Sequence, residues 1–101
     1  MNKARRKELS NVINGLSSTK EKDELYSWIN ILENIKSDEE DYYDNIPENL
    51  QYSQRAEDSE AAIDSLEEAL DLLNEVYDAD EFDKDNELIQ EAIDKVEEAK
   101  W

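Results

Sequence analysis

Carboxylates are the most abundant side chains in this 101-residue chain that could do chemistry. The chain has 29 acidic residues and neither histidine nor cysteine, which removes thiolate chemistry, zinc-thiolate sites and the commonest general base. Two neighbouring carboxylates can act as general acid and base when burial drives their pKa values apart. Here the helical periodicity turns Leu and Ile inward and the acidic residues toward solvent. We therefore expect no catalytic residue and no enzyme.

A second possible use of the carboxylates is cation binding. Asp78, Asp80, Asp83 and Asp85 could offer oxygen ligands to a hard cation such as calcium. With Asp78 as the first position of an EF-hand loop, Phe82 falls on a ligand position and Asp83 falls on the position of the turn glycine. Ile89 then stands where the bidentate glutamate is needed, so the EF-hand pattern does not fit. We expect an acidic connection between helices, with no cofactor and no specific metal site. Weak, nonspecific divalent binding remains the alternative.

The charge distribution is one-sided. The formal net charge is −18, and only five of the 11 basic residues lie between Asp23 and Trp101. Such a chain repels nucleic acid and anionic lipid and favours basic protein surfaces. No apolar run approaches the roughly 20 residues that cross a bilayer, and the basic start is not followed by a signal-peptide apolar segment. We expect a cytoplasmic protein with a basic protein partner, no direct nucleic acid and no membrane. The basic start should pair with acidic helices.

The elements that must position the carboxylates are helices. Apolar residues recur at helical spacing, and the single Gly and single Pro argue against an intrinsically disordered chain. Asn14 and Gly15 predict the end of a first helix. Ser17, Ser18 and Thr19 then predict an N-cap for the second helix. Pro47 predicts where that second helix ends. The predicted helices span about 3–16, 19–44, 53–78 and 86–100. The fold class is all-α: one domain, 1–101, forming an antiparallel bundle or extended hairpin of three to four helices. Whether the last helix folds back is left open.

The second predicted helix contains an irregular stretch. After an apolar face that ends at Ile35, the charged residues Lys36 and Glu39 fall on the same stripe. Ser37 and Glu40 also have the spacing of a capping box, which starts helices. We therefore expect the helix to kink or restart within 37–41.

The third predicted helix has two contrasting faces. One is a coiled-coil-like apolar seam, and the opposite face is nearly all carboxylate. The seam consists of Ala56, Ile63, Leu66, Leu70, Leu73 and Tyr77. Trp28 and Tyr77 are expected in the core. Tyr42, Tyr43, Tyr52 and Phe82 lie beside acidic runs, where they act either as anchors for an arginine-rich partner or as packing between helices.

The acidic surface is the candidate binding site. Like charges at i, i+4 destabilise a helix by about 0.2–0.5 kcal/mol per pair, so a one-sided acidic face is held against its own repulsion. The spacing of carboxylates three and four positions apart on a helix is close to the spacing of phosphates along nucleic acid. Such a row of carboxylates can occupy a lysine- and arginine-lined groove. The predicted partner-binding residues are Asp38, Glu39, Glu40, Asp41, Asp44, Glu57, Glu60, Asp64, Glu67, Glu68, Asp71, Glu75, Asp78, Asp80, Glu81 and Asp83.

The stretch from Asp44 to Leu66 carries a resemblance. The run Asp-Asn-Ile-Pro-Glu-Asn-Leu-Gln, then Ser53, Arg55 and a long Glu/Ala/Ile/Leu helix, resembles small acidic helical proteins of Gram-positive phages and prophages. That class includes anti-defence factors, among them anti-CRISPR proteins and restriction inhibitors that mimic nucleic acid. The resemblance implies a phage-type inhibitor in the host bacterial cytoplasm that blocks a nucleic-acid-binding protein such as a Cas nuclease. The alternative is a structural or assembly protein that forms a homodimer or docks through its apolar seams.

Overall fold

The chain folds into four helices joined by short connections. The computed structural model describes residues 2–101, and no strand occurs within them. The helices are α1 (Lys3–Ser17), α2 (Lys22–Asp44), α3 (Gln54–Asp78) and α4 (Glu87–Ala99), with a 3-10 turn, η1 (Glu48–Leu50), between α2 and α3. The predicted all-α fold is confirmed.

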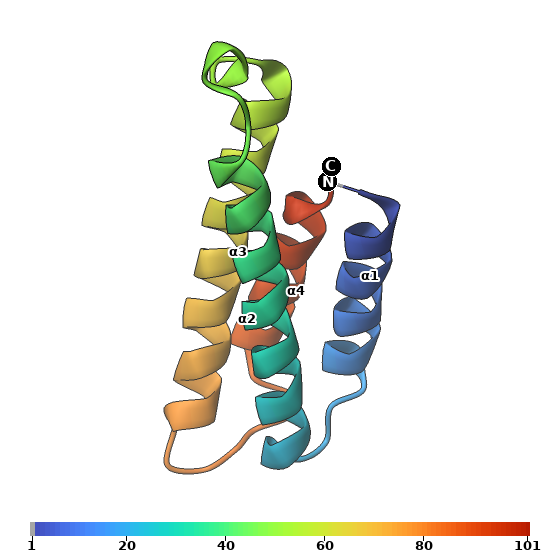
Figure 1. The fold of residues 1–101 in the computed structure, drawn as a ribbon. Helices are drawn as coiled ribbons and strands as arrows, with labels where there is room; N and C mark the ends of the chain where they lie inside the picture. Colours follow the sequence, from blue (N-terminus) through green and yellow to red (C-terminus); the bar gives the residue numbers. More distant parts are fainter. Residues whose placement is uncertain (1) are drawn as a thin grey trace.

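Neighbouring helices run antiparallel and form a four-membered bundle (Figure 1). Helix α1 contacts α2 and α4, and α3 contacts α2 and α4, so the last helix folds back onto the others. Helices α2 and α3 have 23 and 25 residues, against 15 in α1 and 13 in α4. The η1 end of the α2–α3 hairpin therefore extends beyond α1 and α4, and the molecule measures 49 × 22 × 18 Å (Figure 1).

All four helices turn an apolar stripe into one common core. Leu9 of α1, Leu32 of α2, Leu66 of α3 and Val96 of α4 are completely buried. Burying a side chain of this kind stabilises the fold by up to about 1.5–3 kcal/mol. Trp28 and Tyr77 are half-buried and pack against this core, in agreement with the prediction for both.

Helix α2 is continuous, so the kink predicted within 37–41 is absent. The helix runs unbroken from Lys22 to Asp44 and ends just before Pro47, as expected. Ser37 is an exposed residue inside the helix. The charged residue on the apolar stripe, Glu39, is buried with polar partners and does not interrupt the helix.

The α1–α2 turn differs from the prediction in two respects. Gly15 does not end α1, because the helix continues to Ser17. The missing side chain of Gly15 instead makes room for the Trp28 indole. The hydroxyls of Ser17, Ser18 and Thr19 donate to carbonyls of α1 instead of capping α2. Helix α2 therefore begins at Lys22, three residues later than predicted.

Helix α3 buries the predicted seam. Leu66, Leu70 and Leu73 are buried, while Ile63 is half-buried. The seam also includes Ser59, which lies in the seven-residue step between Ala56 and Ile63 and is fully buried. Most of the apolar seam thus packs into the chain's own core.

Candidate functional site

The outward surface of α3 is a row of carboxylates. The helix begins with the Ser53 hydroxyl accepting a hydrogen bond from the Ala56 amide at 3.3 Å, and this cap sets the register. Eight acidic side chains, called here the α3 acidic face, are exposed on the side away from the core: Glu57, Glu60, Asp64, Glu67, Glu68, Asp71, Glu75 and Asp78. Arg55 is the only basic residue within α3.

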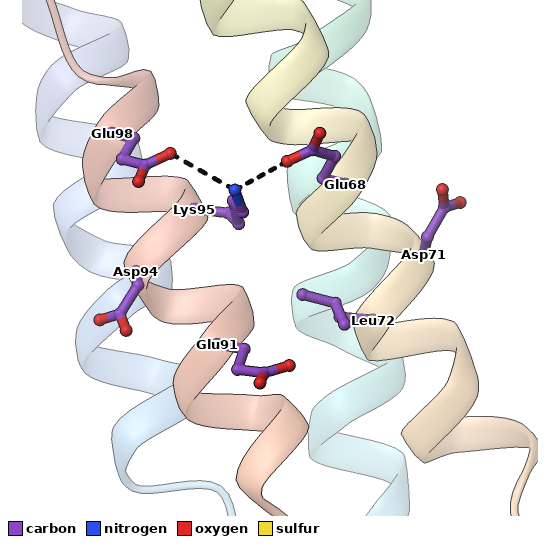
Figure 2. Close-up of a pocket in the computed structure, with 7 residues that line it drawn as sticks. All are labelled: Glu68, Asp71, Leu72, Glu91, Asp94, Lys95 and Glu98. Carbon is purple, nitrogen blue, oxygen red and sulfur yellow. Dashed lines mark ion pairs between the residues drawn. The ribbon is translucent and has the colours of Figure 1, made fainter.

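A shallow groove lies between the α3 acidic face and α4. Its volume is about 630 Å³, and Figure 2 shows carboxylates from both helices along it, with Leu72 as the apolar part of its lining. The lining residues are Glu68, Asp71, Leu72, Glu91, Asp94, Lys95 and Glu98. The groove is acidic on both walls, and Lys95 is the one cation among them.

Lys95 joins the two walls of the groove. Its Nζ lies 2.9 Å from Oε2 of Glu68 on α3 and 3.7 Å from Oε2 of Glu98 on α4 (Figure 2). The hydrogen bond and charge of Glu68, with the charge of Glu98, raise the pKa of Lys95 above its ordinary value. The remaining carboxylates of the groove keep a large excess of negative charge.

The other predicted binding residues lie at two further places. Asp38, Glu40, Asp41 and Asp44 are exposed on the last turns of α2. Asp80, Glu81 and Asp83 are exposed in the α3–α4 connection. The connection is ordered partly by its own carboxylate, because Asp83 Oδ1 accepts a hydrogen bond from the Asp85 amide at 2.9 Å.

Glu39 does not belong to the exposed surface, and its assignment to the partner-binding set is wrong. Its side chain is completely buried. Its Oε1 accepts hydrogen bonds from the Ser59 hydroxyl at 2.9 Å and the Trp101 indole at 3.2 Å, and its Oε2 lies 2.9 Å from Arg5 Nε. These four residues are called here the Glu39 network.

The Glu39 network ties the two ends of the chain to the α2–α3 hairpin. Arg5 comes from α1, and Trp101 follows α4. A charge from the basic start thus pairs with an acidic helix, as expected for Arg5. Lys100 links the two ends of the chain to each other, donating from Nζ to the Ser10 hydroxyl of α1 at 3.0 Å. A buried carboxylate without partners would be costly, so the network allows Glu39 to lie inside.

The aromatic residues near the acidic runs divide between packing and exposure. Tyr42 packs beside Trp101, with ring centroids 6.2 Å apart, and Phe82 packs against the core. The half-buried Tyr43 lies beside Glu60, whose charge, together with burial and a hydrogen bond, raises the pKa of the Tyr43 hydroxyl. Tyr52 alone of the four is open to solvent, with 94% of its surface exposed.

Residues 2–101 contain neither a grouped metal site nor a membrane-spanning helix. No three or more carboxylates in this range are grouped so that they could hold a metal ion. Nor does any helix in the described part of the chain combine the length and apolar character needed to span a bilayer.

Comparisons with known proteins add nothing to this geometry. No protein-family model, no curated protein and no solved structure matches the chain. The class that the fold defines is an acidic four-helix bundle with an exposed carboxylate row.

The sequence contains two signals of the Glu39 network, although Glu39 was interpreted as part of a kink and as an exposed binding residue. Glu39 falls on the apolar stripe of α2, and Ser59 stands in the gap of the α3 seam. Two polar residues at core positions of adjacent antiparallel helices are the pattern of a buried hydrogen-bonded pair. The contribution of Trp101 had no such signal, because it depends on how α4 folds back.

Proposed function

We propose that this protein binds a basic nucleic-acid-binding protein and blocks the surface on which that protein holds DNA or RNA. The observation that carries the proposal is the α3 acidic face. From Glu57 to Glu75 its carboxylates extend along about 27 Å of helix axis. One strand of nucleic acid presents about eight phosphates over the same length, at roughly 3.4 Å each.

The rigidity of the α3 acidic face supports this role. Its carboxylates stand on a 25-residue helix that is packed on both α2 and α4. The inward side of the same helix supplies Leu66, Ala69 and Leu73, all fully buried. A preordered row of charges pays little entropy when it binds, and it meets arginine and lysine side chains with charge-assisted contacts.

Charge complementarity also defines the mechanism. The protein would act by occupying the partner's basic groove, without any chemical step, and competing nucleic acid would displace it. Binding should weaken with added salt, as expected for contacts between opposite charges. The phage-type anti-defence resemblance makes a defence nuclease, such as a Cas nuclease, the partner class to test first.

The test is capture of partners from a bacterial lysate on the immobilised protein, washed at low and then moderate salt. We expect one nucleic-acid-binding protein to survive the moderate-salt wash and to be released by added DNA. A set of unrelated basic proteins that all leave at the first salt step would contradict the proposal, as would recovery of the bait alone.

Matched variants locate the binding surface. The test variant is Glu60→Lys, Asp64→Lys, Glu67→Lys and Asp71→Lys, which reverses the middle of the α3 acidic face. The control reverses four exposed carboxylates in α1, at the N-cap of α2 and within α2: Glu8→Lys, Glu21→Lys, Glu24→Lys and Glu33→Lys. Both change the net charge equally, so the proposal requires that only the test variant loses capture while both remain helical by circular dichroism.

A further inference from the structure

Two of the 11 basic residues line one hollow beside the Glu39 network. The hollow has a volume of about 400 Å³, and its lining comes from both ends of the chain and from the α2–α3 hairpin. It is lined by Asn2, Arg5, Tyr42, Arg55 and Trp101. Two guanidinium groups and two aromatic rings therefore face one space, and no acidic side chain is among its lining residues.

Arg5 is held in place with donors to spare. Its Nε lies 2.9 Å from Oε2 of Glu39, and its guanidinium lies 5.5 Å from the centre of the Tyr42 ring. The arginine side chain carries five N–H donors, of which Nε supplies one. Its side chain is 15% exposed, so the ion pair and the ring fix the guanidinium at the wall of the hollow.

Arg55 brings a second guanidinium from the start of α3. It is exposed and makes no ion pair with any described residue. The nearest acidic residue one turn along α3, Asp58, already accepts a hydrogen bond from Gln54 at 2.8 Å. Glu39, the carboxylate next to the hollow, is already engaged by three partners. Glu39 balances the charge of Arg5, so the positive charge available at the hollow is that of Arg55. The carboxylates farther away are screened beyond about 8 Å at physiological salt.

The aromatic walls define the rest of the ligand. Tyr42 and Trp101 lie with ring centroids 6.2 Å apart and planes inclined at 53°, and the Trp101 indole is fixed by its hydrogen bond to Glu39. The space is within the usual range of small-molecule pockets, about 300–1,000 Å³. Aromatic faces beside guanidinium groups suit a planar ring that carries an oxyanion.

We propose that this hollow binds a small aromatic oxyanion of the nucleoside monophosphate class. Arg5 and Arg55 hold the phosphate oxygens through charge-assisted hydrogen bonds, and Tyr42 and Trp101 pack against the base. The site is separate from the α3 acidic face and does not depend on the function proposed for that face.

The probe is AMP, followed by the NMR signals of the two indole N–H groups in the unmodified protein. The Trp101 signal should shift saturably. The signal of Trp28, which lies on α2 against Gly15, should stay in place. Inorganic phosphate and adenosine are the comparison ligands, and each should bind at least about tenfold more weakly than AMP. Equal binding of phosphate and AMP would overturn the role of the aromatic walls, and the absence of saturable binding would overturn the site.

Arg55→Gln is the decisive variant, because removing Arg5 would leave Glu39 buried without its ion pair. Arg55 is exposed and its removal should not unfold the protein. We expect AMP to bind at least about tenfold more weakly, the typical effect of losing one charged hydrogen bond. Lys84→Gln removes the same charge from the exposed α3–α4 connection and should leave binding unchanged. An Arg55→Gln protein that binds AMP like the wild type would refute the proposal.

Discussion

The carboxylates of the Glu39 network and those of the α3 acidic face have opposite relations to the fold. Glu39 is completely buried and has three partners from three different segments of the chain. On the α3 acidic face Glu68 is the one carboxylate that forms an ion pair within residues 2–101, with Lys95 of α4, and its neighbours are exposed. The same chemical group therefore stabilises the tertiary structure at one place and strains a helix at another.

This contrast separates structure from interaction. A buried carboxylate is retained only where its partners satisfy it, so changes there are felt by the whole fold. An exposed row of like charges destabilises its own helix slightly and is available to a partner. Variants that remove one carboxylate from each region should therefore shift stability in opposite directions.

The largest effect is expected from Glu39→Ala. The change leaves Arg5 without its ion-pair partner and Ser59 and Trp101 without their acceptor. We expect the free energy of unfolding to fall by about 3 kcal/mol, at the low end for a broken buried pair because Arg5 keeps some contact with water. Urea unfolding measures this. Glu40→Ala, which removes an exposed neighbour, should change it by no more than about 0.5 kcal/mol; equal losses in both variants would erase the contrast.

An uncharged site at the contact between α1 and α2 gives the next largest effect. Gly15→Ala would usually stabilise a helix by about 1 kcal/mol, but here the new methyl group collides with the Trp28 indole. We expect a loss of about 1–3 kcal/mol from overpacking. Thermal or urea unfolding measures it, and the loss should be insensitive to salt. A more stable Gly15→Ala protein would show that Trp28 moves away without cost; Asn14→Ala, at the exposed neighbouring position, is the helix-propensity control.

Neutralising the α3 acidic face should act in the opposite direction. The triple variant Asp64→Asn, Glu67→Gln and Asp71→Asn relieves repulsion with neighbours three and four positions away. We expect the free energy of unfolding to rise by about 1–2 kcal/mol at low salt, from about 0.2–0.5 kcal/mol per pair. The gain should vanish near 1 M salt, where the screening length is about 3 Å. A variant less stable than the wild type at low salt would mean that these carboxylates support the fold.

The smallest effect concerns Lys95 in the groove. Its pKa is raised in the folded state by Glu68, so the folded protein holds this proton more tightly than the unfolded chain does. The resulting stabilisation is complete below the ordinary value of 10.5 and is lost as the pH rises through the folded value. An NMR titration of the Lys95 side chain should show this raised pKa, and Glu68→Gln should lower it. An unchanged pKa in Glu68→Gln would show that the ion pair does not form in solution.

Most of the fold could be predicted from the sequence because the signals were local. The starts of α3 and α4 follow from the capping residues Ser53 and Asn86, and the end of α2 follows from Pro47. The start of α2 could not be predicted as well. Thr19 has the side chain of an N-cap, but in the folded chain its hydroxyl bonds backward to Gly15.

The exposed part of the candidate site was also predictable, since helical register alone separates the carboxylate face from the apolar seam. The environment of Glu39 could not be predicted from the pattern of α2 alone. A charged residue on an apolar stripe is either a break or a buried charge, and the two are distinguished only by partners distant in sequence. For Glu39 those partners are 20 and 62 positions away at Ser59 and Trp101, and a periodicity within one helix carries no information about them.

The unequal lengths of the helices have a further consequence for how the molecule opens. The η1 end of the α2–α3 hairpin lies beyond α1 and α4 (Figure 1), and it carries exposed apolar side chains such as Leu50 and Tyr52. Segments with few buried contacts exchange their amide hydrogens through local opening, whereas core positions such as Leu32 and Leu66 exchange only when the whole domain unfolds. We therefore expect the tip of the hairpin to open locally while the buried side of α3 stays folded.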